Sequence, residues 1–317
     1  MMLKGIKFRI YPNEEQKQII EQTFGCCRLI YNKALAMRKE AFEKNEKIGY
    51  KQTSAMLTEM KTQEEFAFLK EADSVALQQA LRDLDMSFSR FFKKYARYPR
   101  FRKKSDNHQA YRTLSKHICF VGNCIKLPKL GYVKVKQSME VGQIRNVTVE
   151  RSPSGRYFVV VCTEFVPKKI ENKGNTITLY LGTDFFYKDS NGNVVNDPPG
   201  LDELYKKMQR EQKKLSRKES GSKNREKQRI KLARVHERLS DKRNDFLQKL
   251  STELIRENQT IIIDDSEVRD KGVNYLQSKS VSSISYCKFI EMLKYKAQWY
   301  GNEVIILGEE EEEKAEA

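Results

Sequence analysis

Residues 145–161, RNVTVERSPSGRYFVVV, are the stretch that decides the fold. Two valine-rich runs flank residues 152–155, SPSG, whose residue types favour a turn, so the stretch predicts a β-hairpin. Residues 3–10, LKGIKFRI, alternate polar and apolar side chains, and residues 125–136, IKLPKLGYVKVK, contain further strand-like runs. We expect all three segments to share one barrel-like sheet.

The chain between the first strand and this sheet has a helical pattern. Asn13 and Gln16 have the spacing of a capping box, which marks the start of a helix. Apolar side chains then recur at helical spacing to about residue 98, and Pro99 is expected to end the last helix. We therefore predict that helices over residues 13–98 are inserted between two parts of the sheet.

The second half of the chain shows a different order of elements. Residues 177–185, ITLYLGTDF, begin with a strand, and residues 201–258 form a long polar helical stretch with a break at 220–222, SGS. Residues 260–265, TIIIDD, predict a buried strand that ends in two carboxylates, and a helix and a final strand follow. Residues 190–193, SNGN, form a turn that makes a hairpin after the first strand. The order strand, hairpin, helices, strand, helix, strand predicts an α/β domain of the ribonuclease H type.

The charge balance of the 317 residues favours an anionic partner. Lys and Arg number 60 against 43 Asp and Glu, a net charge of +17, although residues 309–317, EEEEEKAEA, are strongly acidic. Such a surplus is typical of proteins that bind nucleic acid. No apolar run has the length of a signal sequence or membrane span, and six cysteines form no disulfide framework. We expect a cytoplasmic, nucleoid-associated protein without a membrane partner.

Several segments, in this order along the chain, resemble the TnpB family of transposon-encoded RNA-guided DNA endonucleases, which are related to the type V CRISPR effectors. They include FGCCRLIYNKAL (24–35), YPRFRKK (98–104), NVTVERSPSGRYFV (146–159) and EMLKYKAQWYG (291–301). The resemblance implies an α+β multidomain fold in which a wedge β-barrel carries an inserted helical recognition domain and precedes a truncated RuvC/RNase H-like α/β domain. It also implies two partners, a guide RNA and a target double-stranded DNA with a short flanking motif.

The implied domain boundaries are as follows. The wedge β-barrel comprises residues 1–12 and 106–170, the helical recognition domain residues 13–105, the RuvC-like domain residues 171–308 and the acidic tail residues 309–317.

The RuvC-like domain departs from the family where the metal ligands are expected. RuvC-type chemistry needs carboxylates that hold two Mg²⁺ ions roughly 4 Å apart. An ungapped alignment places Tyr180 at the first aspartate, and a gapped alternative places Asp184 there. Asp264 falls where the family has a longer glutamate, and neither a zinc knuckle nor a final aspartate follows residue 307. We therefore predict degenerate catalytic positions, lost Mg²⁺ and Zn²⁺ sites, and a protein that is not an enzyme.

The function that follows is RNA-guided DNA binding that represses transcription without cleavage, with the guide RNA as the only required cofactor. One alternative is a residual Mg²⁺-dependent endonuclease that uses Asp184, Asp264 and Asp265. The other is an RNA-binding protein that acts only on its own RNA.

Candidate nucleic-acid contacts fall into two sets. The resemblance implies that Tyr50, Ser74 and Gln78 contact the flanking motif; without it, Gln78 would be read as an exposed helix residue. Backbone contacts are expected from basic residues in two stretches: Lys93, Lys94, Arg97, Arg100, Arg102, Lys103 and Lys104, and on the barrel Lys126, Lys129, Lys134 and Lys136. The positive excess of residues 206–249 also favours nucleic-acid backbone over a merely solvated face. Four aromatic residues at helical spacing are interpreted as core and not as base-stacking residues: Phe88, Phe91, Phe92 and Tyr95.

Overall fold

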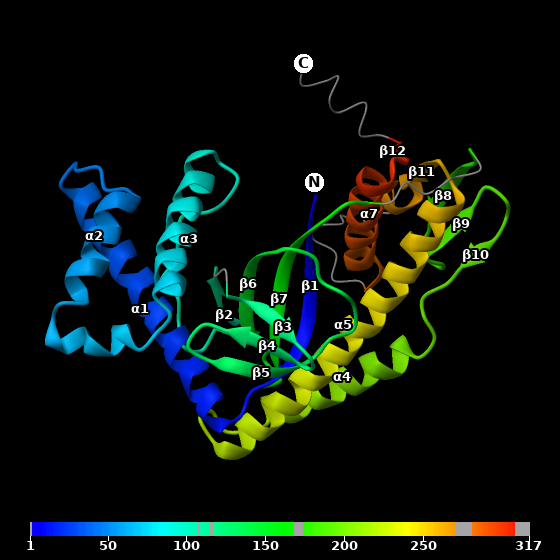
Figure 1. Ribbon diagram of the computed structural model, residues 1–317. Helices are drawn as coiled ribbons and strands as arrows, with labels where there is room; N and C mark the ends of the chain where they lie inside the picture. The colour runs from blue at the N-terminus through cyan, green and yellow to red at the C-terminus, as the bar shows by residue number, and fades with distance from the viewer. Residues whose placement is uncertain (1, 107, 115–116, 168–173, 271–280, 308–317) are drawn as a thin grey trace. The chain divides into compact units, whose positions relative to one another are not determined.

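The computed structural model describes residues 2–106, 108–114, 117–167, 174–270 and 281–307 (Figure 1). The chain forms two compact units, Met1–Phe165 and Val166–Ala317. The finer division at residues 12, 105 and 170 stays a prediction, and the acidic tail at 309–317 lies outside the described residues.

The first unit is built on a seven-stranded antiparallel sheet with the order β2-β6-β7-β1-β5-β4-β3. Its strands are β1 (Met2–Tyr11), β2 (Gln109–Thr113), β3 (Cys119–Val121), β4 (Cys124–Leu127), β5 (Gly131–Lys136), β6 (Ile144–Arg151) and β7 (Tyr157–Phe165). The expected hairpin is confirmed as β6–β7, and Gly155 adopts the positive φ of 81° that its turn requires. The sheet curls as a half-barrel, as expected from the sequence (Figure 1).

The N-terminal strand lies in the interior of this sheet. β1 pairs with β7 from Met2 to Ile10 and with β5 from Arg9 to Tyr11. The predicted sharing of one sheet by residues 3–10, 125–136 and 145–161 is therefore confirmed.

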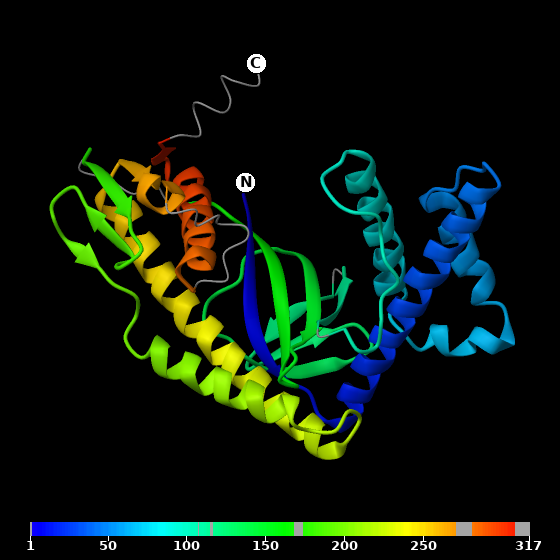
Figure 2. The ribbon, with the colours of Figure 1, turned by 180° about the vertical axis from the view of Figure 1, so that it is seen from behind.

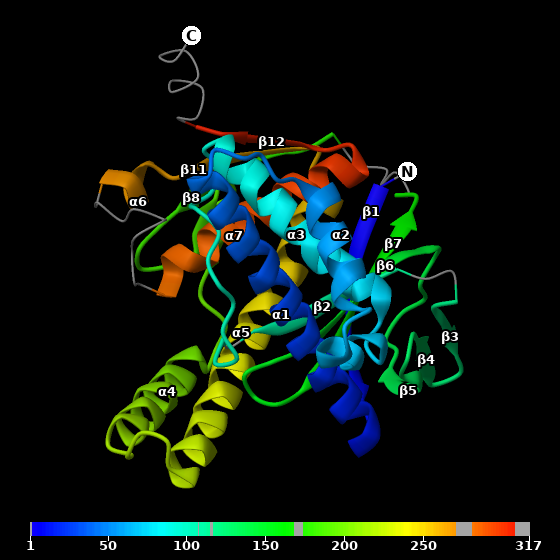
Figure 3. The ribbon, with the colours of Figure 1, turned by 90° about the vertical axis from the view of Figure 1, so that its left-hand side faces the viewer.

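Three α-helices and a 3-10 helix are inserted between β1 and β2. They are α1 (Glu14–Glu43), α2 (Tyr50–Met60), η1 (Glu64–Lys70) and α3 (Ser74–Phe92), and Figure 3 shows α1, α2 and α3 side by side. The capping box of Asn13 and Gln16 is present at the start of α1. The expectation that Pro99 ends the last helix is wrong, because α3 already ends at Phe92 and Lys94 then takes a left-handed conformation with φ 61°.

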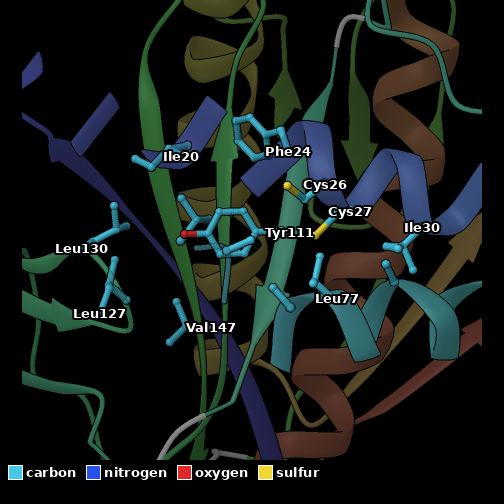
Figure 4. Packing of buried hydrophobic residues seen from close by; sticks show 14 of the residues in the cluster. Ile20, Phe24, Cys26, Cys27, Ile30, Leu77, Tyr111, Leu127, Leu130 and Val147 are labelled. Atoms are coloured by element: carbon cyan, nitrogen blue, oxygen red, sulfur yellow. The ribbon is translucent and has the colours of Figure 1, made fainter. Parts of the chain in front are cut away.

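The helices and the sheet share one apolar core. Figure 4 shows Ile20, Phe24 and Leu77 of the helices facing Tyr111 and Val147 of the strands. The ring of Phe24 meets that of Tyr111 edge-on, with the centroids 5.7 Å apart. Burial of these side chains is the main force that fixes the inserted helices against the sheet.

The second unit contains a five-stranded mixed sheet with the order β10-β9-β8-β11-β12. Its strands are β8 (Thr176–Leu181), β9 (Tyr187–Asp189), β10 (Val194–Val195), β11 (Thr260–Asp264) and β12 (Glu303–Ile306). β11 is parallel to both β8 and β12, whereas β9 is antiparallel to β8 and β10. Its helices are α4 (Leu201–Ser216), α5 (Lys223–Glu257), α6 (Ser266–Asp270) and α7 (Val281–Tyr300).

The predicted break at 220–222 is confirmed: it separates α4 from α5, and the two helices lie side by side (Figure 2). The Ser222 hydroxyl caps α5 by accepting a hydrogen bond from the Arg225 backbone nitrogen. Within the described parts of the chain, no helix is both long enough and apolar enough to span a membrane.

One buried carboxylate joins α3 to the sheet, and its removal tests this link. The Asp73 side chain caps α3 by accepting a hydrogen bond from the Val75 backbone nitrogen at 3.0 Å, and it also accepts one from the Thr113 hydroxyl on β2. We expect Asp73→Ala to lower the free energy of unfolding by about 1–3 kcal/mol, because a helix cap and a buried partner are lost together. Urea unfolding followed by circular dichroism measures the change.

Ser74→Ala is the matched control, because Ser74 is exposed and adjacent to Asp73. Equal stability of the two variants would contradict the role assigned to Asp73.

Candidate nucleic-acid interface

The parallel strands of the second unit bring two of the predicted RuvC positions together. In the β8–β11 ladder, Tyr180 is the direct partner of Asp264. Neighbouring strands lie about 4.8 Å apart, so these two residues are adjacent at the carboxyl end of the sheet. Tyr180 is 44% exposed, and an Asp264 carboxylate oxygen accepts a hydrogen bond from the Ser266 backbone nitrogen at 3.0 Å.

The other carboxylates near this edge are separated by their local structure. Asp184 lies exposed in the bend after β8, and Asp265 is buried with 6% exposed. Glu267 accepts a hydrogen bond from the Thr183 hydroxyl at 3.5 Å. Among the residues that the structure describes, no three His, Cys, Asp or Glu side chains are grouped so that they could hold a metal ion. The register places the Tyr180 phenol beside Asp264, and the loss of the Mg²⁺ site stays a prediction.

The residues expected to read the flanking motif lie on α2 and α3. Ser74 and Gln78 are both exposed and four residues apart, so they share one face of α3. Tyr50 begins α2, and its hydroxyl accepts a hydrogen bond from Arg82 Nε at 3.5 Å. The Arg82 guanidinium also lies 5.3 Å from the centroid of the Tyr50 ring.

Arg82 is a candidate that sequence reasoning missed. It follows Gln78 by four residues and is exposed on the same face of α3. Because Arg82 contacts Tyr50, the candidate motif-reading residues of α2 and α3 lie on one surface. The four-residue spacing of Ser74, Gln78 and Arg82 was the available signal.

Most of the basic stretch after α3 is exposed. The exposed cations are Lys93, Lys94, Arg97, Arg100, Lys103 and Lys104. Arg102 differs, because its guanidinium lies 3.9 Å from the centroid of the Tyr31 ring and 3.9 Å from an Asp83 carboxylate oxygen. Its backbone also exchanges two hydrogen bonds of 2.9 Å with the Asn32 side chain, so Arg102 anchors the segment to α1.

The interpretation of the aromatic residues in this region as core is only partly correct. Phe88 is buried with 8% exposed, and Phe91 is half-buried. Phe92 and Tyr95 are 74% and 76% exposed, so for them the interpretation is wrong. The helical spacing does not extend to Tyr95, because α3 ends at Phe92.

The predicted barrel lysines lie on the solvent side of their strands. Lys126 on β4 alternates with buried Ile125 and Leu127, and Lys134 and Lys136 on β5 flank buried Val135. Strand alternation therefore turns these lysines away from the core. Lys129 lies between the two strands and is exposed.

A cationic cleft lies between α4 and α5 in the second unit. It has a volume of about 600 Å³ and is lined by Lys207, Glu211, Lys214, Arg217, Lys218, Gln228, Lys231, Arg234, Val235 and Arg238. Hydrogen bonds from Lys214 and Gln228 lower the pKa of its acidic residue, Glu211. The cations from the two facing helices give the cleft a strongly positive potential.

Comparison with known proteins gives these surfaces a family context. A family model described as a helix-turn-helix domain matches residues 1–47, and one described as a probable transposase, OrfB of IS605, matches residues 147–271. A putative RNA-guided DNA endonuclease of Streptomyces pristinaespiralis is 36% identical over 309 residues, which are 96% of this chain and 77% of the relative. The chain belongs to the TnpB family.

Two further similarities extend along nearly all of this TnpB-family chain. The putative RNA-guided DNA endonuclease InsQ of Escherichia coli (strain K12) is 29% identical over 321 residues, which are 96% of this chain and 80% of the relative. The cryo-EM structure of the Cas12f1-sgRNA-target DNA complex matches 96% of this chain and 88% of that chain, with a TM-score of 0.53 and 11% identity. At that identity the match concerns the fold alone, and it confirms the predicted α+β architecture of a curled antiparallel sheet with helices.

The relatives overturn one prediction made from the sequence. Both relatives that match 96% of this TnpB-family chain are named RNA-guided DNA endonucleases, so the prediction that the chain is not an enzyme is wrong. It rested on individual ligand positions such as Tyr180. The similarity to the two relatives, by contrast, extends along nearly the whole chain.

The pairing of Tyr180 with Asp264 predicts the behaviour of a designed carboxylate pair. We expect Tyr180→Asp to lower the thermal midpoint without divalent ions, because like charges directly opposite each other on neighbouring strands repel. Millimolar Mg²⁺ should restore much of the loss, because carboxylate oxygens are its preferred ligands. Thermal unfolding with Mg²⁺ and with a chelator measures both effects.

Thr176→Asp supplies the control, because Thr176 pairs with Thr260 at the far end of the same ladder. A Mg²⁺ response of equal size in both variants would show that Tyr180 and Asp264 are not adjacent.

Proposed function

We propose that this chain binds DNA under the direction of a guide RNA at a site marked by a short flanking motif, and that it represses transcription by occupying that site. The observation that carries the proposal is the 36% identity, over 96% of the chain, to a relative named as a putative RNA-guided DNA endonuclease. In such systems base pairing with the guide reads the sequence, and the protein reads the flanking motif and the backbone. Guide RNA and target DNA are therefore the partners.

Different surfaces of the chain have the chemistry to bind bases and to bind phosphates. The α3 face of Ser74, Gln78 and Arg82, with Tyr50 beside it, has the chemistry for base edges, because Gln pairs with adenine and Arg with guanine in the major groove. The exposed lysines of the barrel and the α4–α5 cleft have the chemistry for phosphates of the guide RNA.

Repression by occupancy is the finer part of the proposal. It is supported by the register that pairs Tyr180 with Asp264 in the second unit. The strand order of that unit, β10-β9-β8-β11-β12, is consistent with the predicted ribonuclease H-type domain. A stable guide–target duplex over a promoter excludes polymerase without strand cleavage. Binding of this kind needs the guide RNA and requires neither Mg²⁺ nor Zn²⁺. The site of action is chromosomal DNA in the bacterial cytoplasm.

The decisive experiment identifies the RNA that copurifies with the chain and then tests whether its guide directs repression. The chain is expressed with the DNA that flanks its gene, and the copurifying RNA is sequenced; we expect a defined scaffold that ends in a short variable guide. A reporter whose promoter matches that guide should be repressed, and Asp264→Ala should repress it equally.

Three outcomes would overturn parts of the proposal. Random copurifying RNA would remove RNA guidance. Repression that disappears in Asp264→Ala while target binding persists would remove occupancy as its cause. Cleavage of target plasmid by the guide-loaded protein with Mg²⁺, lost in Asp264→Ala, would assign the endonuclease activity named for the relatives to this chain.

Flanking-motif readout is tested on the shared face of α3. We expect Gln78→Ala and Arg82→Ala each to weaken binding to the preferred motif by about 1–3 kcal/mol, with little effect on poor motifs, because base-edge hydrogen bonds are lost. Guide-loaded protein is measured against duplexes with a randomised flank. Gln212→Ala, an exposed helical glutamine on α4, is the control. An unchanged motif preference in both test variants would refute the assignment.

The α4–α5 cleft is tested by the salt dependence of RNA binding. The double variant Lys231→Gln and Arg234→Gln should reduce the slope of log K against log salt by about 1.4, because each lost contact with single-stranded RNA removes about 0.7. Lys44→Gln with Lys47→Gln removes the same charge from exposed sites at the end of α1. Equal slopes for the two double variants would mean that the cleft does not hold phosphates.

A further inference from the structure

At the end of α3, a cluster of aromatic rings packs against one side of Phe92 and leaves its other side exposed to solvent. The ring of Phe92 is stacked on that of Phe88 with centroids 6.2 Å apart, and it lies 5.3 Å from the ring of Phe91. Tyr98 meets Phe88 and Phe91 edge-on at 5.5 and 5.2 Å. Phe92 is thus supported by neighbouring rings while 74% of it is exposed.

Cations surround the cluster on all the segments that form it. Residues 86–104 contain no acidic side chain, and Arg90, Lys93, Lys94, Arg97 and Arg100 are exposed. From α1, Lys39 Nζ lies 4.7 Å from the centroid of the Phe101 ring, whereas the Arg38 guanidinium, 4.8 Å from the centroid of the Phe88 ring, is buried in an ion pair with Asp85. An exposed apolar surface surrounded by positive charge complements an aromatic ligand that carries negative charge.

The turn between α3 and Tyr95 has Lys94 at a position where glycine is usual. Tyr95 N donates to Arg90 O at 2.9 Å, and Lys94 N donates to Phe91 O at 2.9 Å, which is the Schellman arrangement. Lys94 occupies its left-handed position with φ 61°, where glycine has no steric cost. Lys94 therefore places a cation between Phe92 and Tyr95, in a backbone conformation that is strained for a residue other than glycine.

We propose that Phe92 and Tyr95 form a stacking platform for unpaired nucleobases of a single nucleic-acid strand, whose phosphates bind the adjacent cations. Every nucleobase has a π-face, so such a platform accepts any sequence. This inference rests on the proposed function, because guided binding creates unpaired segments in the guide RNA and in the displaced DNA strand.

The test compares two single strands that differ only in their bases. Fluorescein-labelled oligonucleotides of equal length, one normal and one with abasic sites throughout, are titrated with the full-length chain freed of copurified RNA. We expect the wild type to prefer the normal strand. Phe92→Ala should weaken its binding at least about fivefold and leave the abasic strand unchanged, because only stacking is lost.

Matched variants separate stacking from apolar contact and from charge. Phe92→Leu retains an apolar side chain without a ring and should behave as Phe92→Ala, whereas Phe92→Trp should restore the preference. Phe68→Ala is the control, because Phe68 is 38% exposed on η1, before the start of α3. Lys94→Gly should stabilise the fold yet weaken binding of both strands alike.

Two outcomes would overturn the platform. One is an unchanged ratio of normal to abasic affinity in Phe92→Ala. The other is a wild-type oligomer that Phe92→Ala converts to a monomer in light scattering while binding of both strands is unchanged, which would assign the surface to a protein partner. Because this assay uses no guide, its result is independent of whether RNA guidance holds.

The assembled complex then identifies the source of the strand. Bromouracil is placed either in the guide RNA or in the displaced DNA strand, and crosslinks to the peptide that contains Phe92 are mapped. A crosslink from one of them supports the platform and names its ligand. Crosslinks from neither would overturn the platform in the assembled complex.

Discussion

The pairing of β1 between β7 and β5 is the constraint on which the first unit depends. β1 is the first strand in the sequence, yet it lies inside the sheet, hydrogen-bonded to β7 from Met2 to Ile10 and to β5 near Tyr11. The chain must therefore leave the sheet after β1, form α1 to α3, and return through β2 at the sheet's edge. The inserted helical segment is therefore attached to the sheet at both ends, through β1 before it and β2 after it.

This constraint also explains how the candidate nucleic-acid surfaces arise. α3 is fixed to β2 by Asp73, Thr113 and the core around Tyr111, so the face opposite the core is free to present Ser74, Gln78 and Arg82. On the strands, alternation commits one side chain in two to the core and turns the lysines outward. Burial of apolar side chains thus decides where the charges are exposed.

Local signals in the sequence were reliable wherever neighbouring residues decide the conformation. The capping box of Asn13 and Gln16, the SPSG turn and the break between α4 and α5 are all present, because each depends on residues within a few positions. The end of α3 was mispredicted because the helical spacing of aromatic residues continues past Phe92, whereas Lys94 adopts a left-handed conformation that residue type does not favour. Consequently the exposure of Phe92 and Tyr95 could not be foreseen.

The sequence by itself determined the order of elements, the positive surplus and the resemblance to TnpB, because these depend on composition, short-range pattern and residue identity. Only the tertiary structure decided that Tyr180 is the direct partner of Asp264, that Arg82 reaches Tyr50, and that Arg102 packs on Tyr31. Each of these contacts joins segments that are distant in the sequence. Strand register and helix packing create such contacts through long-range burial, which no local pattern encodes.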